Sequence, residues 1–157
     1  MTLYFVLKFL HIIGACVLLG TGAGIAFFML MAHLNGKPAV VAAVARIVVL
    51  ADFLFTASAV VVQPITGAWL AYLGGYPIFS GWIFLSIILY VITGGFWPPV
   101  VWFQMRMRDL AEQAAAAGTE LPAEYHSLFR SWFWYGFPAF FSVMAIVALM
   151  ITKPDWP

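Results

Sequence analysis

The chain has 157 residues, of which 65% are hydrophobic and only 8% are charged. A water-soluble domain carries about 25% charged residues, so this composition excludes a soluble protein and makes lipid the solvent. The formal net charge of +1 excludes a nucleic-acid partner, because no basic patch is available to neutralise phosphates. The single cysteine, Cys16, excludes an internal disulfide framework and a cysteine-based zinc site.

Four apolar segments are each long enough to cross a bilayer, which takes about 20 apolar residues in a helix. Turn signals rich in Gly, Asn and Pro at residues 35–38 and 74–77 separate the first three segments. The predicted spans are residues 4–33, 40–72, 80–107 and 128–152.

A polar segment, residues 108–127, connects the third and fourth spans, and its first part, 109–117, is predicted to extend the third helix out of the membrane. The sequence therefore predicts an all-α transmembrane four-helix bundle, with residues 1–157 forming a single integral membrane domain.

Basic residues are unevenly divided between the two sides of this predicted bundle. The side with the 34–38 and 108–127 connections carries five, and the side with the termini carries two. They are Lys37, Arg46, Arg106, Arg108 and Arg130 on the first side, and Lys8 and Lys153 on the second. Because connections rich in Lys and Arg stay in the cytoplasm, we expect a bacterial inner membrane protein with both termini in the periplasm.

Polar side chains within a span are costly and mark candidate functional sites. Counting along each helix at about 1.5 Å per residue places several of them at one depth in the outer half of the bundle. These side chains are His11, Gln63, Ser86, Tyr90 and Met144. Pro64 lacks a backbone N–H, so it frees a helical carbonyl at the same height.

A neutral imidazole in an apolar bundle is a natural axial ligand for heme iron, and methionine is a common second ligand. His11 and Met144 are therefore candidate ligands of heme b, with Gln63 or a residue of another chain in place of Met144 as an alternative. Gly14 and other small residues of the first helix would make room for the macrocycle. Alternatively, His11 hydrogen-bonds a neighbouring helix and the glycines, including the GxxxG motif at 20–24, only permit close packing.

Two histidines, His33 and His126, are predicted at the cytoplasmic face beside a group of methionines. Imidazole together with soft thioether sulfur suits copper(I), although methionines at helix ends also serve as adaptable packing. The methionines are Met29, Met31, Met105 and Met107.

Asp52 lies in the inner half of the second span. A buried carboxylate needs a cationic partner or a proton, so we expect a structural ion pair between Asp52 and Arg130, with a proton relay as the alternative. No nucleophile–base motif, glycine-rich phosphate loop or HExxH sequence is present, which excludes hydrolase and NTPase functions. Other catalysis stays open, and no catalytic residue is identified.

Several short motifs occur in the order found in a known superfamily. They are LKFLHIIG at 7–14, Gln-Pro, Gly and Trp-Leu within 63–70, Gly-Trp at 81–82, RMR at 106–108, and Pro138. Together they resemble the helices of the HemJ-type protoporphyrinogen oxidases and of the related CopD-like copper-resistance membrane domains. Over nearly the whole chain, the pattern most resembles an uncharacterised bacterial family of predicted integral membrane proteins within that superfamily.

HemJ-type proteins bind heme b, and the resemblance implies that His11 is the first-helix ligand. The Lys and His of their third helix have no counterpart at 84–86 or 95–97, so the resemblance implies heme binding without protoporphyrinogen oxidation. We expect an electron-transfer or redox component whose partners are lipid, a redox protein, other membrane subunits or a second copy. The alternative hypothesis is a non-catalytic structural subunit of a membrane complex, and the third hypothesis is a copper-handling protein.

Overall fold

The structure, a computed structural model, describes residues 2–79 and 81–154. Within these residues all regular structure is helical. The elements are α1 (Leu3–Asn35), α2 (Pro38–Ala51), the π-helical segment η1 (Asp52–Thr56), α3 (Ala57–Leu73), α4 (Gly81–Ala117) and α5 (Ala123–Thr152). Because α2, η1 and α3 run on without a break, they form one span, and four spans are long and apolar enough to cross a membrane. The predicted all-α transmembrane four-helix bundle is confirmed.

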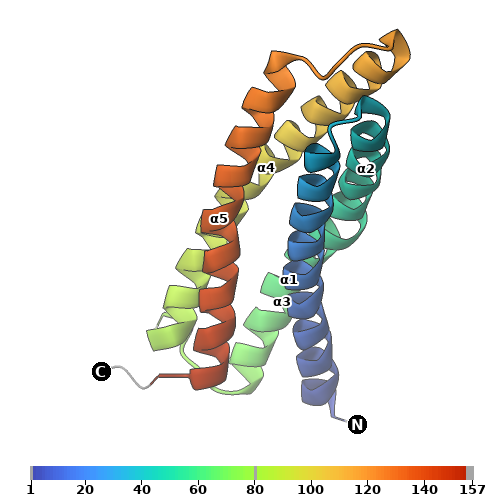
Figure 1. The fold of residues 1–157 in the computed structure, drawn as a ribbon. Coiled ribbons are helices and arrows are strands. Elements are labelled where there is room, and N and C mark those ends of the chain that lie inside the picture. The colour runs from blue at the N-terminus through green and yellow to red at the C-terminus, as the bar shows by residue number, and fades with distance from the viewer. Residues whose placement is uncertain (1, 80, 155–157) are drawn as a thin grey trace.

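The two ends of the bundle are unlike each other. The start of α1, the end of α5 and the α3–α4 turn lie at one end, which we call the terminal end, and the α1–α2 and α4–α5 connections lie at the other, the connection end (Figure 1). At the terminal end, Lys153 Nζ lies 5.5 Å and 5.8 Å from the ring centroids of Tyr76 and Trp82. This contact holds the last turn of α5 against the start of α4.

The connection between α4 and α5 is much shorter than the predicted 108–127. The polar extension at 109–117 is helical, as expected, because alanine is the best helix former and fills positions 114–117. Gly118 ends α4 with a φ of 66°, and Pro122 is the N-cap residue of α5. Only residues 118–122 are left outside the helices. The predicted start of the third span, Ser80, lies outside the described residues.

Among the described residues, the apolar core cluster lies in the connection half of the bundle, where α1, α2, α4 and α5 meet. Its buried side chains are Ile25, Met29, Ala32, Val41, Ala42, Ala45, Val48, Met107, Leu110, Ala111, Tyr125, Phe129 and Trp132. An ion pair between Arg46 and Glu112, at 2.7 Å, joins α2 to α4 beside this core. In the terminal half, small or polar residues such as Gly14, Gln63 and Thr66 are buried instead.

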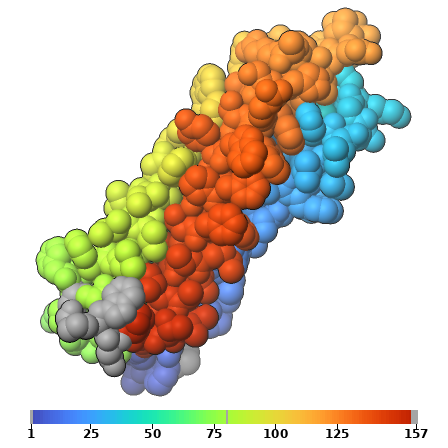
Figure 2. Space-filling view, turned by 60° about the vertical axis from the view of Figure 1, so that its left-hand side comes forward, coloured from blue at the N-terminus to red at the C-terminus, as the bar shows by residue number. Residues whose placement is uncertain are grey.

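Helix α5 forms a continuous ridge along the molecule, with α4 on one side and α1 on the other (Figure 2). Large apolar side chains on it, including Phe137, Phe141 and Met144, are exposed. In water such a surface would be unstable, but lipid tails solvate it. The exposed apolar surface is therefore the lipid-facing surface of an integral membrane protein.

Candidate functional site

The imidazole of His11 is held by a hydroxyl group of the neighbouring span. His11 Nδ1 lies 2.8 Å from Thr66 Oγ1, and the Thr66 hydroxyl lies 2.8 Å from the backbone carbonyl of Val62. Because the hydroxyl proton is donated to that carbonyl, Thr66 Oγ1 accepts the hydrogen bond from His11 Nδ1–H. This arrangement favours the tautomer protonated at Nδ1, in which Nε2 carries the lone pair, and the ring also lies within hydrogen-bonding reach of the Gln63 backbone.

Gln63 and two glycines bring α1 and α3 close together around this ring. The Gln63 amide donates through Nε2 to the backbone carbonyl of His11 at 3.1 Å, while its Oε1 is buried without a hydrogen-bond partner among the described residues. A Cβ on Gly67 would lie 3.1 Å from His11 Cε1, and a Cβ on Gly14 would lie 3.3 Å from Gln63 Nε2. A Cβ at either position would require the neighbouring side chain to shift by a few tenths of an ångström, so glycine favours this close approach.

The backbone carbonyl freed by Pro64 is satisfied from a third span. Pro64 lies inside α3, and its missing N–H would otherwise have bonded the carbonyl of Val60, four residues earlier. The hydroxyl of Tyr90, on α4, donates to that carbonyl. Tyr90 therefore repairs the helix at the point where the proline interrupts it and connects α4 to the His11 region.

The structure brings together only part of the predicted layer. His11, Gln63 and Gly14 are in contact, as described above. Ser86 is buried, but its hydroxyl donates to the Trp82 carbonyl of its own helix at 2.7 Å. Met144 is exposed on α5. Among the described residues, neither Ser86 nor Met144 forms an interaction with His11.

The ion pair predicted between Asp52 and Arg130 is not among the ion pairs of the described residues. Asp52 is buried, 4% exposed, and accepts a hydrogen bond of 3.4 Å from Trp97 Nε1. Arg130 is exposed on α5 and is in none of the ion pairs of the described residues. The physical reason is that a long arginine side chain near the end of a span extends towards the interface, where its charge is solvated.

The two histidines at the connection end do come together, but in an aromatic cluster. The His33 ring stacks on Phe129 with the centroids 3.6 Å apart and meets the His126 ring at 5.7 Å. Met29 and Met107 are fully buried in the apolar core. The described residues contain no group of three or more His, Cys, Asp or Glu side chains suited to a metal ion. His33, Met29 and Met107 therefore take part in aromatic and apolar packing.

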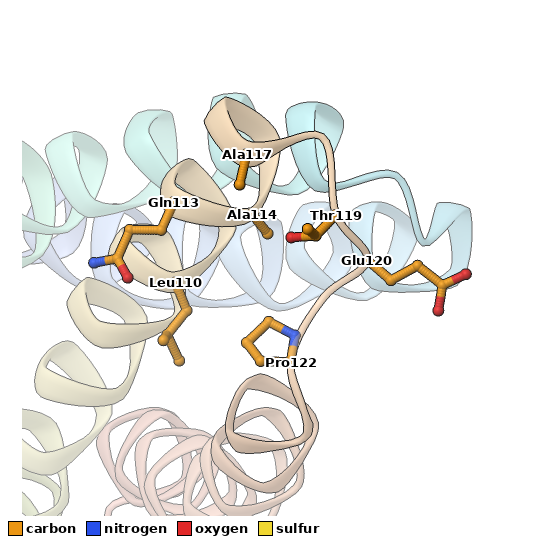
Figure 3. Close-up of a pocket in the computed structure, with 7 residues that line it drawn as sticks. All are labelled: Leu110, Gln113, Ala114, Ala117, Thr119, Glu120 and Pro122. Carbon is orange, nitrogen blue, oxygen red and sulfur yellow. The ribbon is translucent and has the colours of Figure 1, made fainter.

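A shallow hollow lies at the connection end, between the end of α4 and the connection to α5 (Figure 3). Leu110, Ala114 and Pro122 form its apolar part, and Thr119 and Glu120 form its rim. His11 belongs to the terminal half of the molecule, so this hollow is unconnected with the candidate site.

The prediction from sequence does not include Thr66 or Gly67. Both lie within one helical turn of Gln63, so they share its helix face. A signal for Thr66 is present in the sequence, because a buried imidazole N–H needs an acceptor on a neighbouring helix. Gly67 carries no such signal, since its role depends on the register between α1 and α3.

Comparison with known proteins gives a family for this set of spans. Residues 5–154 match the family described as "Predicted integral membrane protein (DUF2269)". The chain belongs to this family. Its description gives membrane insertion, which agrees with the four spans, and no activity. No match to the chain was found among curated proteins or among solved structures. The function of this member of the DUF2269 family is therefore inferred from the site itself.

Proposed function

We propose that this integral membrane protein binds heme b and acts as an electron-transfer or redox-accessory component, with His11 as an axial ligand. One observation carries the proposal: His11 Nδ1 lies 2.8 Å from Thr66 Oγ1, whose own proton goes to the Val62 carbonyl, and this favours the tautomer with a lone pair on Nε2. An imidazole that ligates iron needs this tautomer, and metal-binding histidines commonly donate their other N–H to a neighbouring acceptor.

The surroundings of His11 suit a large apolar cofactor. The apolar core cluster lies in the other half of the bundle. The space at Gly14 and Gly67 is filled by Gln63 and His11 themselves, so the group would lie outside this α1–α3 contact, against His11 Nε2. The group would supply one-electron transfer when bound. The protein's part is to hold the imidazole through Thr66, to position α1 through Gln63 and to keep water out with its apolar spans.

The second axial ligand would be Met144 or a residue of another chain. Met144 is exposed on α5, and α5 packs beside α1. A thioether ligand would raise the reduction potential relative to a second histidine. The likeness of residues 7–14 and 63–70 to the HemJ-type proteins supports the same choice of His11.

The orientation belongs to the same proposal. The connection end carries Lys37, Arg46, Arg106 and Arg108 near its helix ends, and basic connections stay in the cytoplasm. The terminal end, with His11, would then face the periplasm of a bacterial inner membrane. An electron carried by this protein would enter or leave from the periplasmic half of the bilayer.

The experiment is a visible spectrum of the full chain, purified in detergent after expression with ample heme supply. The proposal predicts a Soret band, with sharp α and β bands after reduction. His11→Ala should lose them, whereas His33→Ala, a matched control in the aromatic cluster, should keep them. A wild-type protein without these bands, or bands that survive His11→Ala, would contradict the proposal or its ligand.

A further inference from the structure

The second span carries a buried carboxyl group that the heme proposal does not use. Asp52 begins the π-helical segment η1 in the middle of the span Pro38–Leu73. Trp97 Nε1 donates to its Oδ1 at 3.4 Å, and the side chains of Thr56 and Gln104 lie beside the same carboxyl group. Asp52, Thr56 and Gln104 are all buried, with exposed fractions of 4%, 9% and 1%.

This carboxyl group has no basic partner. Among the described residues, each ion pair joins an arginine to a carboxylate other than that of Asp52. The pairs are Arg46–Glu112 at 2.7 Å, Arg106–Glu124 at 3.0 Å and Arg108–Asp109 at 2.7 Å. None of the titratable groups on α1, α2, α3 or α4, the elements around η1, forms an ion pair with Asp52 in the part of the chain that the structure describes. An ionised carboxylate in the middle of a bilayer without a counter-charge is prohibitively costly.

Two further oxygens beside Asp52 are also unsatisfied. Thr56 Oγ1 and Gln104 Oε1 are buried and have no close hydrogen-bond partner within the described residues, although both side chains lie within longer hydrogen-bonding reach of the Asp52 carboxyl group. A buried acceptor without a partner costs about 1–3 kcal/mol, and two of them next to one carboxyl group mark a place where a positively charged donor or ion would fit. All three groups are hard oxygen donors.

The π-helical segment gives the same place a fourth source of oxygen. Backbone bonding in η1 shifts from the fourth to the fifth preceding residue, as the bond from Ala57 N–H to the Asp52 carbonyl shows. A single shift of this kind leaves one carbonyl outside the helical ladder, and π-helical turns occur frequently at functional sites. Asp52 and Thr56 both belong to this π-helical segment and are buried. The irregular backbone and the cluster of oxygens therefore lie at the same place.

We propose that Asp52, Thr56 and Gln104 form an intramembrane site for one monovalent positive charge, either a sodium ion or a proton. The ionised site has one negative charge, on the Asp52 carboxylate, and its other oxygens are neutral. A single positive charge therefore neutralises it, whereas a divalent ion would leave a net charge buried in the bundle. With a proton, the Asp52 carboxyl would donate to Gln104 Oε1. With sodium, the carboxylate, hydroxyl and amide oxygens would be ligands.

The first arm of the test measures sodium. The thermal unfolding midpoint of the detergent-purified full chain is followed while NaCl replaces choline chloride at constant ionic strength. If sodium binds, the midpoint rises by about 5–10 °C when its concentration is 100 times the dissociation constant. Asp52→Asn should abolish the rise, and Thr56→Val, which keeps the side-chain shape, should weaken it.

The second arm measures the proton by infrared spectroscopy. A protonated Asp52 predicts a carboxylic-acid C=O band that shifts in D₂O and is missing in Asp52→Asn. The matched control for both arms is Asp109→Asn, because that carboxyl group is paired with Arg108 near the connection end and its loss should leave both signals unchanged. If Asp52→Asn does not fold, Thr56→Val and Gln104→Leu carry the test, through a reduced sodium shift or a displaced C=O band.

A sodium-dependent midpoint identifies the ion as sodium, and a carboxylic-acid band without sodium dependence identifies it as a proton. An unchanged midpoint together with the absence of any band assignable to Asp52 would overturn the proposal. Neither arm depends on the visible spectrum, so failure of this site and failure of the heme proposal are distinguishable.

Discussion

The Thr66 hydroxyl donates to the Val62 carbonyl and accepts from His11 Nδ1, so one small side chain sets the protonation pattern of the imidazole. The same hydroxyl also lies 3.2 Å from the Gln63 carbonyl. Its proton therefore has two backbone acceptors within reach and is not available to the ring. At the residue scale, the candidate site depends on this arrangement more than on any residue apart from His11.

Replacing Thr66 by valine should keep the side-chain shape and remove the acceptor. The imidazole could then change tautomer or rotate, and loss of such a supporting hydrogen bond typically weakens metal affinity about 10–100-fold. We expect a correspondingly weaker heme affinity for Thr66→Val, measured by titrating the apoprotein with heme. The matched control is Thr93→Val, because the Thr93 hydroxyl donates to the Leu89 carbonyl of its own helix at 2.8 Å without touching His11. Equal losses in both variants would contradict the role given to Thr66.

Gly67 and Gly20 give a second pair of matched variants. A Cβ at position 67 would lie 3.1 Å from the His11 ring, whereas a Cβ at position 20 has nothing within 4 Å. Gly67→Ala should lower the free energy of unfolding by about 1–3 kcal/mol through overpacking. Gly20→Ala should leave it unchanged or raise it by about 0.5–1 kcal/mol, because alanine is the better helix former. Equilibrium unfolding in mixed detergent micelles measures both, and a more stable Gly67→Ala would refute the close α1–α3 approach.

Much of this residue-scale arrangement is predictable, and the limits have physical causes. Helical rise alone places His11 and Gln63 at one depth, and the structure joins them. It cannot tell which way a side chain points, so Ser86 and Met144 were predicted in a layer in which they make no contact with His11. The GxxxG motif at 20–24 also predicts close packing, but a Cβ at Gly20 would have no atom within 4 Å among the described residues.

Within the elements, α3 combines a helix-breaking proline with a repair from α4. Pro64 frees the Val60 carbonyl, and the Tyr90 hydroxyl donates to it. The bilayer core contains no water that could donate a hydrogen bond to an unsatisfied carbonyl. This contact is therefore a structural link between the second and third spans.

A double-mutant cycle tests this link. Tyr90→Phe should cost about 1–3 kcal/mol of unfolding free energy, because it leaves the Val60 carbonyl unsatisfied. In a Pro64→Ala background the helix regains its own N–H donor, so the same substitution should cost much less. Tyr72→Phe is the control, since Tyr72 is 79% exposed. An equal cost of Tyr90→Phe in both backgrounds would show that the two residues are not coupled.

The spans themselves were predictable because a run of apolar residues long enough to cross lipid has few alternatives to a helix. The π-helical segment η1 was not predictable, because its sequence, DFLFT, has no feature that distinguishes a π-helical turn from an α-helix. For the same reason the partners of Asp52 were missed. A shift of one residue in the backbone ladder changes the direction of its side chain, and Trp97 takes the place expected for Arg130.

Over the whole molecule, the apolar core cluster and the His11 contacts occupy opposite halves. The connection half holds the core around Met29, Met107 and Tyr125, and the terminal half holds the His11–Thr66 and Gln63 contacts. Stability within one structure is rarely uniform. We infer that the connection half is the rigid base and that the terminal half is the part that adapts to a cofactor or partner.

The orientation of the bundle is tested with single cysteines. In a Cys16→Ala background, Thr2→Cys at the terminal end should react with a membrane-impermeant thiol reagent in intact cells with a permeabilised outer membrane. Thr119→Cys, in the α4–α5 connection, should react only after the inner membrane is opened. Both reactions are read by mass shift. The reverse pattern would invert the proposed orientation and place His11 in the cytoplasmic half.

Chemical rescue tests whether His11 Nε2 ligates heme. In His11→Gly the ligand is removed and a space of imidazole size is left between α1 and α3. Added imidazole should restore the Soret band and the reduced α and β bands of the wild type, in proportion to its concentration. If His11 is the ligand, His11→Gly loses the heme absorption bands and regains them with imidazole. A wild type with no heme spectrum, or a His11→Gly variant whose spectrum is unchanged before imidazole is added, would contradict this role of His11.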